Sequence, residues 1–267
     1  MELQNQNRRG KKSNVTIKIS VSIAVLFIAY FVILSIMAPS VKIASINKEF
    51  GYNKPEKGGY YDSIFFDSTF IALNRAKSFY QARISMASTD SVSLSVNLPD
   101  SIAILEIDGV SVYNTKINKA IISKVFVKAD EYAVSSMLST PFNVIHDYST
   151  IKKEPVVHKV APRDTTEYKP DAPPDTSKTE YVNVIFETRE GIRLHIFQET
   201  NGNSNAFFHR FVFDLTDRFR NAFYILKCMV TFKMPEYHPY IKINVSAKDA
   251  RIIYRALPQN GQFAIFR

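Results

Sequence analysis

Residues 92–117 read VSLSVNLPDSIAILEIDGVSVYNTKI, and this stretch decides the fold. At its start, Val92, Leu94, Val96 and Leu98 alternate with Ser and Asn. Successive side chains of a strand point to opposite faces, so a period of two residues indicates a strand with one buried face. The stretch therefore predicts a β-sheet that buries one side.

A hairpin follows the first strand. Residues 102–107 are mostly apolar and predict a second strand, which ends at Asp108-Gly109. Asp and Gly both accept the positive φ angles of a two-residue hairpin turn, so residues 110–117 are expected to return as a third strand. A fourth strand is expected over residues 121–127. Together these segments predict a β meander.

The C-terminal third continues the alternation. Strands are expected at residues 181–186, 191–197, 241–245 and 262–266. Apolar residues at helical spacing predict a helix over residues 207–219, and Ser246 can cap a helix over residues 247–256. The expected fold class is mainly β, a β-sandwich or meander with a few helices, preceded by a single transmembrane helix.

Three further segments lie around these strands. Residues 39–61 mix Gly, Pro and charges and are expected to form a stalk. Residues 62–87 have apolar residues near a period of 3.6 and predict an amphipathic helix. Residues 163–180 are rich in Pro, Thr and Asp and predict a flexible loop. This loop either separates two domains or is an insertion in one sheet, which the strands beyond it favour.

The N-terminus has the composition of a membrane anchor. Residues 19–38 carry no charge and are mostly apolar. A helix of about 20 residues covers the hydrocarbon core of about 30 Å. A buried core helix would show a polar face, and a cleaved signal peptide would have a shorter apolar region that ends in small residues, whereas Ile36 stands near its end. An uncleaved anchor is the preferred interpretation.

The flanking charges predict the orientation of this anchor. Residues 1–18 form a basic tail with Arg8, Arg9, Lys11, Lys12 and Lys18. Positive residues are retained on the cytoplasmic side. We therefore expect the N-terminus in the cytoplasm, the anchor in the inner (cytoplasmic) membrane, and residues 62–267 as an extracytoplasmic, periplasmic domain, with its β part over residues 92–267.

The net charge of +9 is partly a property of this tail, since the residues before the anchor contribute a local +4. The remaining charge forms no stripe of Lys and Arg interleaved with stacking aromatics, so nucleic acid is not an expected partner. No CxxC or HExxH spacing occurs, and neither a metal nor a cofactor is expected. The lone Cys228 lies in an apolar run and is either a structural thiol or a reactive one.

Three segments carry a resemblance to a known family. Residues 139–142 read STPF, residues 191–195 read GIRLH, and residues 237–243 read YHPYIKI ahead of the expected C-terminal helix. In that order they resemble the Thr-Pro-Leu-Gly turn, the Ile-His-Gly strand and the Ser-His-Gly-Cys-Ile-Arg-Leu motif of L,D-transpeptidase (YkuD-type) domains. The resemblance covers roughly residues 92–267.

The resemblance gives several residues of this chain a counterpart in the family, but the sequence departs from the family motif at the position of the catalytic nucleophile. Tyr240 stands where the family has its nucleophilic cysteine, and Lys242 stands where it has arginine, a position for ligand binding. His195 corresponds to the family's histidine. The candidate site residues are thus His195, His238, Tyr240 and Cys228, with Lys242 as a ligand contact.

The resemblance implies a catalytically degenerate domain, a pseudoenzyme that binds peptidoglycan or an envelope protein. One alternative is an active L,D-transpeptidase-like enzyme in which Cys228 is recruited as nucleophile and His195 acts as base. Another is a structural subunit of an envelope secretion or motility complex without transpeptidase ancestry.

Overall fold

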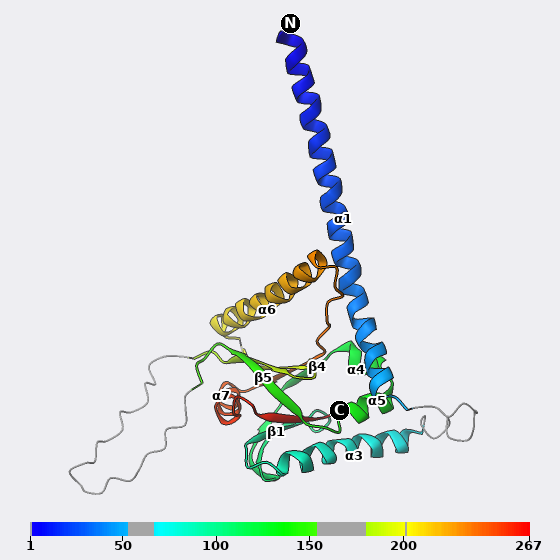
Figure 1. Ribbon diagram of the computed structural model, residues 1–267. Helices are drawn as coiled ribbons and strands as arrows, with labels where there is room; N and C mark the ends of the chain where they lie inside the picture. Colours follow the sequence, from blue (N-terminus) through cyan, green and yellow to red (C-terminus); the bar gives the residue numbers. More distant parts are fainter. Residues whose placement is uncertain (1, 53–66, 154–179, 201) are drawn as a thin grey trace, which may run out of the picture.

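The computed structural model describes residues 2–52, 67–153, 180–200 and 202–267 (Figure 1). The expected loop over residues 163–180 lies outside these residues except for Glu180, and so does the part of the expected stalk after Tyr52. In the described chain the helices are α1 (Glu2–Phe50), α3 (Ser68–Ala87), α4 (Lys124–Lys128), α5 (Glu131–Met137), α6 (Ser204–Val230) and α7 (Ala247–Ala256).

The strands form a nine-stranded mixed sheet with the order β3-β2-β1-β9-β5-β6-β7-β8-β4. Their bounds are β1 (Ser93–Asn97), β2 (Ile102–Ile107), β3 (Val110–Lys116), β4 (Lys119–Ile122), β5 (Phe142–Ser149), β6 (Asn183–Thr188), β7 (Arg193–Gln198), β8 (Tyr240–Val245) and β9 (Gln262–Phe266). Neighbours are antiparallel except for β1 with β9 and β7 with β8, which run parallel.

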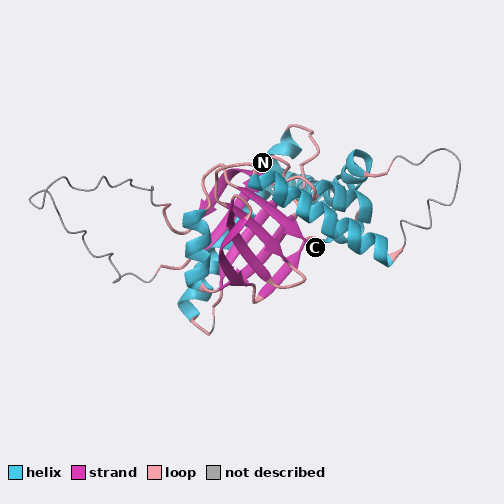
Figure 2. Ribbon diagram, turned by 90° about the horizontal axis from the view of Figure 1, so that it is seen from below, coloured by secondary structure: helices cyan, strands magenta, loops and turns pink. Residues whose placement is uncertain are grey.

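The sheet folds over on itself at β5. Phe142 pairs with Phe263 of β9, whereas Tyr148 pairs with Ile185 of β6, and the register shifts between these two ends. A bulge of this kind bends a strand and increases its twist. The strands of the two halves consequently cross one another (Figure 2). The main core lies between the halves and draws apolar side chains from β1, β2 and β9 on one side and from β6, β7 and β8 on the other.

The helices α7, α3 and α6 pack against the two halves of the sheet. α7 contributes Ile253 and Tyr254 to the main core. α3 covers the outer face at β9, where Phe79, Ala82 and Met86 pack against Ala264 in a second cluster. α6 covers the outer face of the other half, beside β7 and β8 (Figure 1).

α1 leaves the domain as a long rod that ends at the N-terminus (Figure 1). Lys18–Phe50 has a mean hydropathy of 2.7 in its most apolar part, and it is the one described helix long and apolar enough to cross a membrane. From Leu34 onward α1 packs on the domain, and Ile46 is 2% exposed. The expected stalk is therefore wrong for residues 39–50, because apolar residues at helical spacing extend α1 into the core.

The expected meander is confirmed over β1, β2 and β3, with Asp108 at φ 52° and Gly109 at φ 77° in the turn. The expected fourth strand is only half right, because β4 ends at Ile122 and the Ser123 hydroxyl caps α4. The expected helix over residues 62–87 has, in its described part, Asp67 as its N-cap.

The prediction of a mainly β fold is only partly correct. α1, α3 and α6 alone contain 49, 20 and 27 residues. The described chain is therefore a mixed sheet with extensive helices: α3 and α6 pack on the outer faces of the sheet, and most of α1 projects from the domain.

We predict that Arg83→Ala weakens the attachment of α3. Glu106 is 1% exposed, and it accepts hydrogen bonds from Arg83 Nη2 at 2.6 Å and from Ser95 Oγ at 3.0 Å. Removing the guanidinium leaves a buried carboxylate with a single neutral donor, which should cost about 3 kcal/mol of unfolding free energy. Urea unfolding of the full chain in detergent measures this.

Lys77→Ala, on the exposed side of α3, is the control and should change stability by less than about 0.5 kcal/mol. Equal effects of the two substitutions would contradict the prediction.

Candidate functional site

A cleft of about 370 Å³ lies between the outer face of the sheet at β7 and β8, the helix α6 and one side of α1. The parallel register pairs Arg193 with Tyr240 and His195 with Lys242. Alternate residues of a strand share a face. These four side chains therefore lie together on the floor of the cleft.

α6 forms the facing wall. Asn203 caps its start, with the side-chain oxygen accepting hydrogen bonds from the backbone N–H groups of the first turn. Asp214, Asp217, Asn221 and Tyr224 all line the cleft. They recur every three or four residues, which places them on one face of the helix. The part of α6 that lines the cleft is thus mostly polar, whereas Ala206, Cys228 and Met229 are its buried apolar residues.

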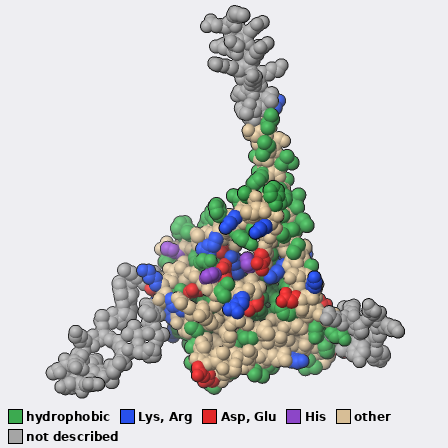
Figure 3. Space-filling model, viewed as in Figure 1, with side chains coloured by type: hydrophobic (Ala, Val, Ile, Leu, Met, Phe, Trp, Pro, Cys, Tyr) green, Lys and Arg blue, Asp and Glu red, His purple; other side chains and the backbone are tan. Residues whose placement is uncertain are grey.

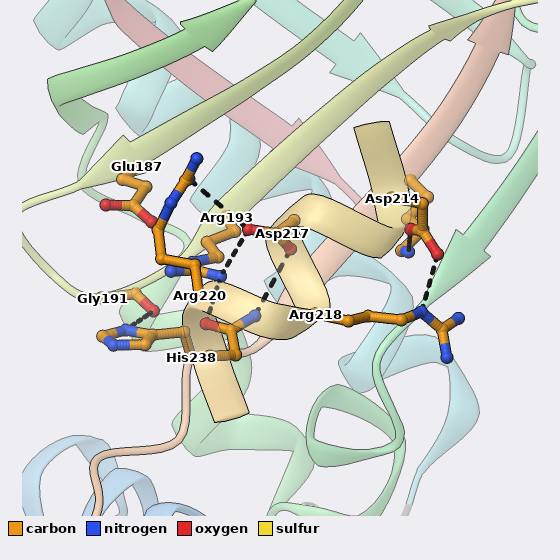
Figure 4. A network of polar contacts seen from close by, with 10 residues as sticks. Glu187, Gly191, Arg193, Asp214, Asp217, Arg218, Arg220 and His238 are labelled. Atoms are coloured by element: carbon orange, nitrogen blue, oxygen red, sulfur yellow. Dashed lines mark hydrogen bonds and ion pairs between the residues drawn. The ribbon is translucent and has the colours of Figure 1, made fainter. Parts of the chain in front are cut away.

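Asp214 connects this wall to the floor. Its carboxylate accepts hydrogen bonds from Lys242 Nζ at 2.9 Å and from Arg218 Nε at 2.8 Å (Figure 4). Burial raises the pKa of Asp214, but the hydrogen bonds and charges of Lys242 and Arg218 outweigh it, so the pKa lies below its ordinary value. Asp214 is an anion that holds Lys242 in place.

Arg193 is the centre of a second network (Figure 4). Its guanidinium forms ion pairs with Glu187 and, at 3.4 Å, with Asp217, and it donates to Asn221 Oδ1 at 2.9 Å. Burial raises the pKa of Asp217 more than the charges of Arg193 and Arg220 lower it. The positive and negative groups under α6 are therefore largely compensated by one another.

His195 is 3% exposed, and its Nδ1 has no hydrogen-bond partner among the described residues. Burial, followed by the charges of Lys242 and Arg193, lowers its pKa from 6.5 to about 3. Its ring meets the Tyr240 ring edge-on, with the centroids 6.0 Å apart. The imidazole is consequently neutral at physiological pH and has a free ring nitrogen beside the cleft.

His238 lies at the side of the cleft where β8 begins. Its Nδ1 donates to the carbonyl oxygen of Gly191 at 3.0 Å (Figure 4). Gly191 has φ +75°, and a Cβ there would lie 3.2 Å from His238 Nδ1 and 3.2 Å from Glu236 Oε1. Glycine is needed at this position because it permits both the left-handed backbone and the close approach of the histidine.

The structure brings four of the five residues singled out from the sequence into this cleft. His195, His238, Tyr240 and Lys242 all line it. Cys228 does not line the cleft and is 7% exposed, within the last turn of α6. The floor residue Arg193 was missed, and so were the wall residues Asp214, Asp217 and Arg218, which lie on α6. The signal that could have found them is the three-to-four-residue spacing of charges on α6, opposite its aromatic residues.

The lining is suited to binding. It holds Arg193, Arg218 and Lys242 as cations, and its anions are equal in number: Asp214, Asp217 and Glu236. The described residues contain no group of three or more His, Cys, Asp or Glu side chains placed to hold a metal ion. A ligand with both positive and negative groups would match such a surface.

No family model, curated protein or solved structure matches this chain. The fold and the site define a class without reference to relatives: a mixed α and β domain with a charged cleft next to a helix that is able to cross a membrane. The function is therefore inferred from the geometry of the cleft.

We predict that His195→Gln flattens the acid side of the stability profile. The folded protein keeps the imidazole neutral, whereas the unfolded chain binds a proton below about pH 6.5. The stability tied to His195 is therefore complete above that pH and is lost as the pH falls toward about 3. The Tm measured against pH in detergent should fall less steeply for His195→Gln than for the unmodified chain. His195→Phe removes the same titration and should give the same flatter curve. Parallel curves for all three proteins would contradict the assignment.

Proposed function

We propose that this chain is a membrane-anchored, extracytoplasmic binding domain that resembles a catalytically degenerate L,D-transpeptidase, and that its cleft binds peptidoglycan stem peptides. α1 is the anchor in the inner (cytoplasmic) membrane, with the basic tail in the cytoplasm and the domain in the periplasm. The apolar length of Lys18–Phe50 and the positive residues before it support this placement.

One observation carries the proposal. His195 and Tyr240 stand at the positions that resemble the histidine and the nucleophile of the family, and they lie with ring centroids 6.0 Å apart in one cleft. These residues are 45 positions apart in the sequence, so chance would seldom place them side by side. The juxtaposition supports an inherited site whose nucleophile has been replaced.

The chemistry of this site favours binding over acyl transfer. A phenol is a poor substitute for a cysteine thiolate as the attacking group. A general base works best with a pKa near the operating pH, and the pKa of His195 is about 3. Cys228, the nucleophile of the enzymatic alternative, is buried outside the cleft. The active enzyme is accordingly the weaker proposal.

The charges of the cleft support a peptide ligand. A peptidoglycan stem peptide carries free carboxylates and an amine within a few residues. Lys242 is 20% exposed at its side chain, and Asp214 is 24% exposed, so each can contact a ligand while the pair stays formed. Charge-assisted hydrogen bonds to such groups are worth roughly 1.5–3 kcal/mol each.

We predict that the full chain in detergent co-sediments with purified sacculi and that Lys242→Met binds them about tenfold more weakly, because one charged donor is lost. Asp214 keeps its hydrogen bond from Arg218 in this variant, so the fold should persist. Lys77→Ala, on α3, is the control and should bind like the unmodified chain. Equal retention of Lys242→Met would exclude the cleft as the binding site. An absence of retention for every protein would overturn the peptidoglycan proposal and favour the structural subunit of an envelope complex.

A further inference from the structure

α6 is amphipathic, but its main apolar side is turned away from the sheet, unlike that of most helices that pack on a sheet. A stripe of apolar side chains at spacings of three and four residues faces away from the domain and is exposed. We call this set the outer stripe of α6: Phe208, Phe211, Leu215, Phe219, Phe223, Leu226 and Val230. The side chains of Phe219 and Phe223 are 66% and 71% exposed.

The charges of α6 lie on the opposite side, toward the cleft, where they accompany the inward-facing Phe213. Asp214 and Asp217 point to Lys242 and Arg193 of the strands, and Asn221 accepts from Arg193 (Figure 4). A helix at the surface of a water-soluble domain normally buries its apolar stripe and exposes its polar face. Burying a large apolar side chain is worth about 1.5–3 kcal/mol, so this row of aromatics needs an apolar environment outside the domain.

The position of α6 identifies that environment. Its C-terminal end lies against α1, where Tyr224 and Ile225 line the cleft with Ser35 and Ala38. At 1.5 Å per residue, Ala38 lies about 30 Å along α1 from Lys18, which is the thickness of a hydrocarbon core. α6 therefore meets α1 at the level where α1 leaves the membrane.

The arrangement of the whole molecule also places α6 on the side of the domain that faces the proposed membrane. α6 lies on the side of the domain from which the free part of α1 projects (Figure 1). Hydrophobic side chains continue from α1 onto that margin of the domain (Figure 3). Beyond the end of α6, the exposed Phe232 and Met234 extend the apolar surface toward α1. The apolar surface of the anchor is thus continuous with that of α6.

We infer that α6 is a second membrane-binding element whose outer stripe inserts into the outer interface of the bilayer that α1 crosses. Interfacial helices bury their apolar face about 5–10 Å into the boundary between headgroups and acyl chains. Arg218, Lys227 and Lys233 are exposed on or just after α6 and can contact lipid phosphates. The inference rests on the proposed membrane anchor. It places the cleft beneath α6, about one helix diameter of 10 Å from the membrane surface.

The test uses the full chain in vesicles of phosphatidylethanolamine and phosphatidylglycerol that contain nitroxide-labelled lipid. An environment-sensitive fluorophore is attached to Phe211→Cys, Phe219→Cys, Ile28→Cys or Ile84→Cys, one variant at a time. Cys228 stays in place because it is buried, and the unmodified chain measures its background labelling. Ile28 reports on α1, and the exposed Ile84 on α3 is the matched control.

The labels at Phe211 and Phe219 should emit at shorter wavelength and be quenched by the labelled lipid about twofold or more beyond the label at Ile84. If the label at Ile28 is quenched while those at Phe211 and Phe219 match Ile84, the anchor stands and the inference on α6 fails. A blue shift without lipid quenching would show that a protein surface, such as a second copy, covers the stripe, and would also overturn it. If the label at Ile28 is not quenched, the proposed anchor itself fails.

Discussion

β7 and β8 lie side by side and run parallel, so the chain between them has to cross over the sheet. Neighbouring parallel strands cannot be joined by a tight turn, because the second strand starts at the end where the first began. α6 provides the crossover and runs across the outer face of both strands. The cleft is the space that remains between this helix and the strands, with α1 at its side. The contacts of Asp214 and Asp217 with the strands depend on this connection.

Ion pairs hold α6 over the strands together with apolar contacts such as Phe213 on Phe197. Arg193 and Lys242 on the floor meet Asp217 and Asp214 on the helix. Partly buried ion pairs contribute little net stability, since desolvation offsets most of their attraction, but the removal of one partner leaves an uncompensated charge and is strongly destabilising. Burial is the main cause of the low pKa of His195, and the charges of the same two cations, Lys242 and Arg193, lower this pKa further, so the groups that position α6 also help to keep the imidazole neutral. An arrangement that suppresses the basicity of its histidine is consistent with binding.

Local patterns predicted much of the fold. The alternation in β1, the Asp108-Gly109 turn, the Ser246 cap and the last strand follow from the chemistry of a few neighbouring residues. The order of strands and the fold-over at β5 depend on contacts between distant segments, which periodicity does not report. For the site, the resemblance placed His195 and Tyr240. The wall on α6 was missed because the helix over residues 207–219 was predicted from its apolar spacing alone, and that spacing does not show that the apolar side chains face outward while the charges face the sheet.

The continuation of α1 to Phe50 changes where a ligand has to be. If α1 is the membrane anchor that we propose, a domain on a stalk could sample a layer of space beside the membrane, whereas a domain packed on α1 from Leu34 onward would stay at the membrane. A single helix leaves the domain free to rotate and tilt about it, and a second apolar contact along α6 would remove that freedom. If both proposed elements engage the bilayer, the cleft would lie at a constant height and orientation above it. For the peptidoglycan ligand that we propose, this geometry would favour stem peptides presented at the membrane surface over those deep in the mature wall.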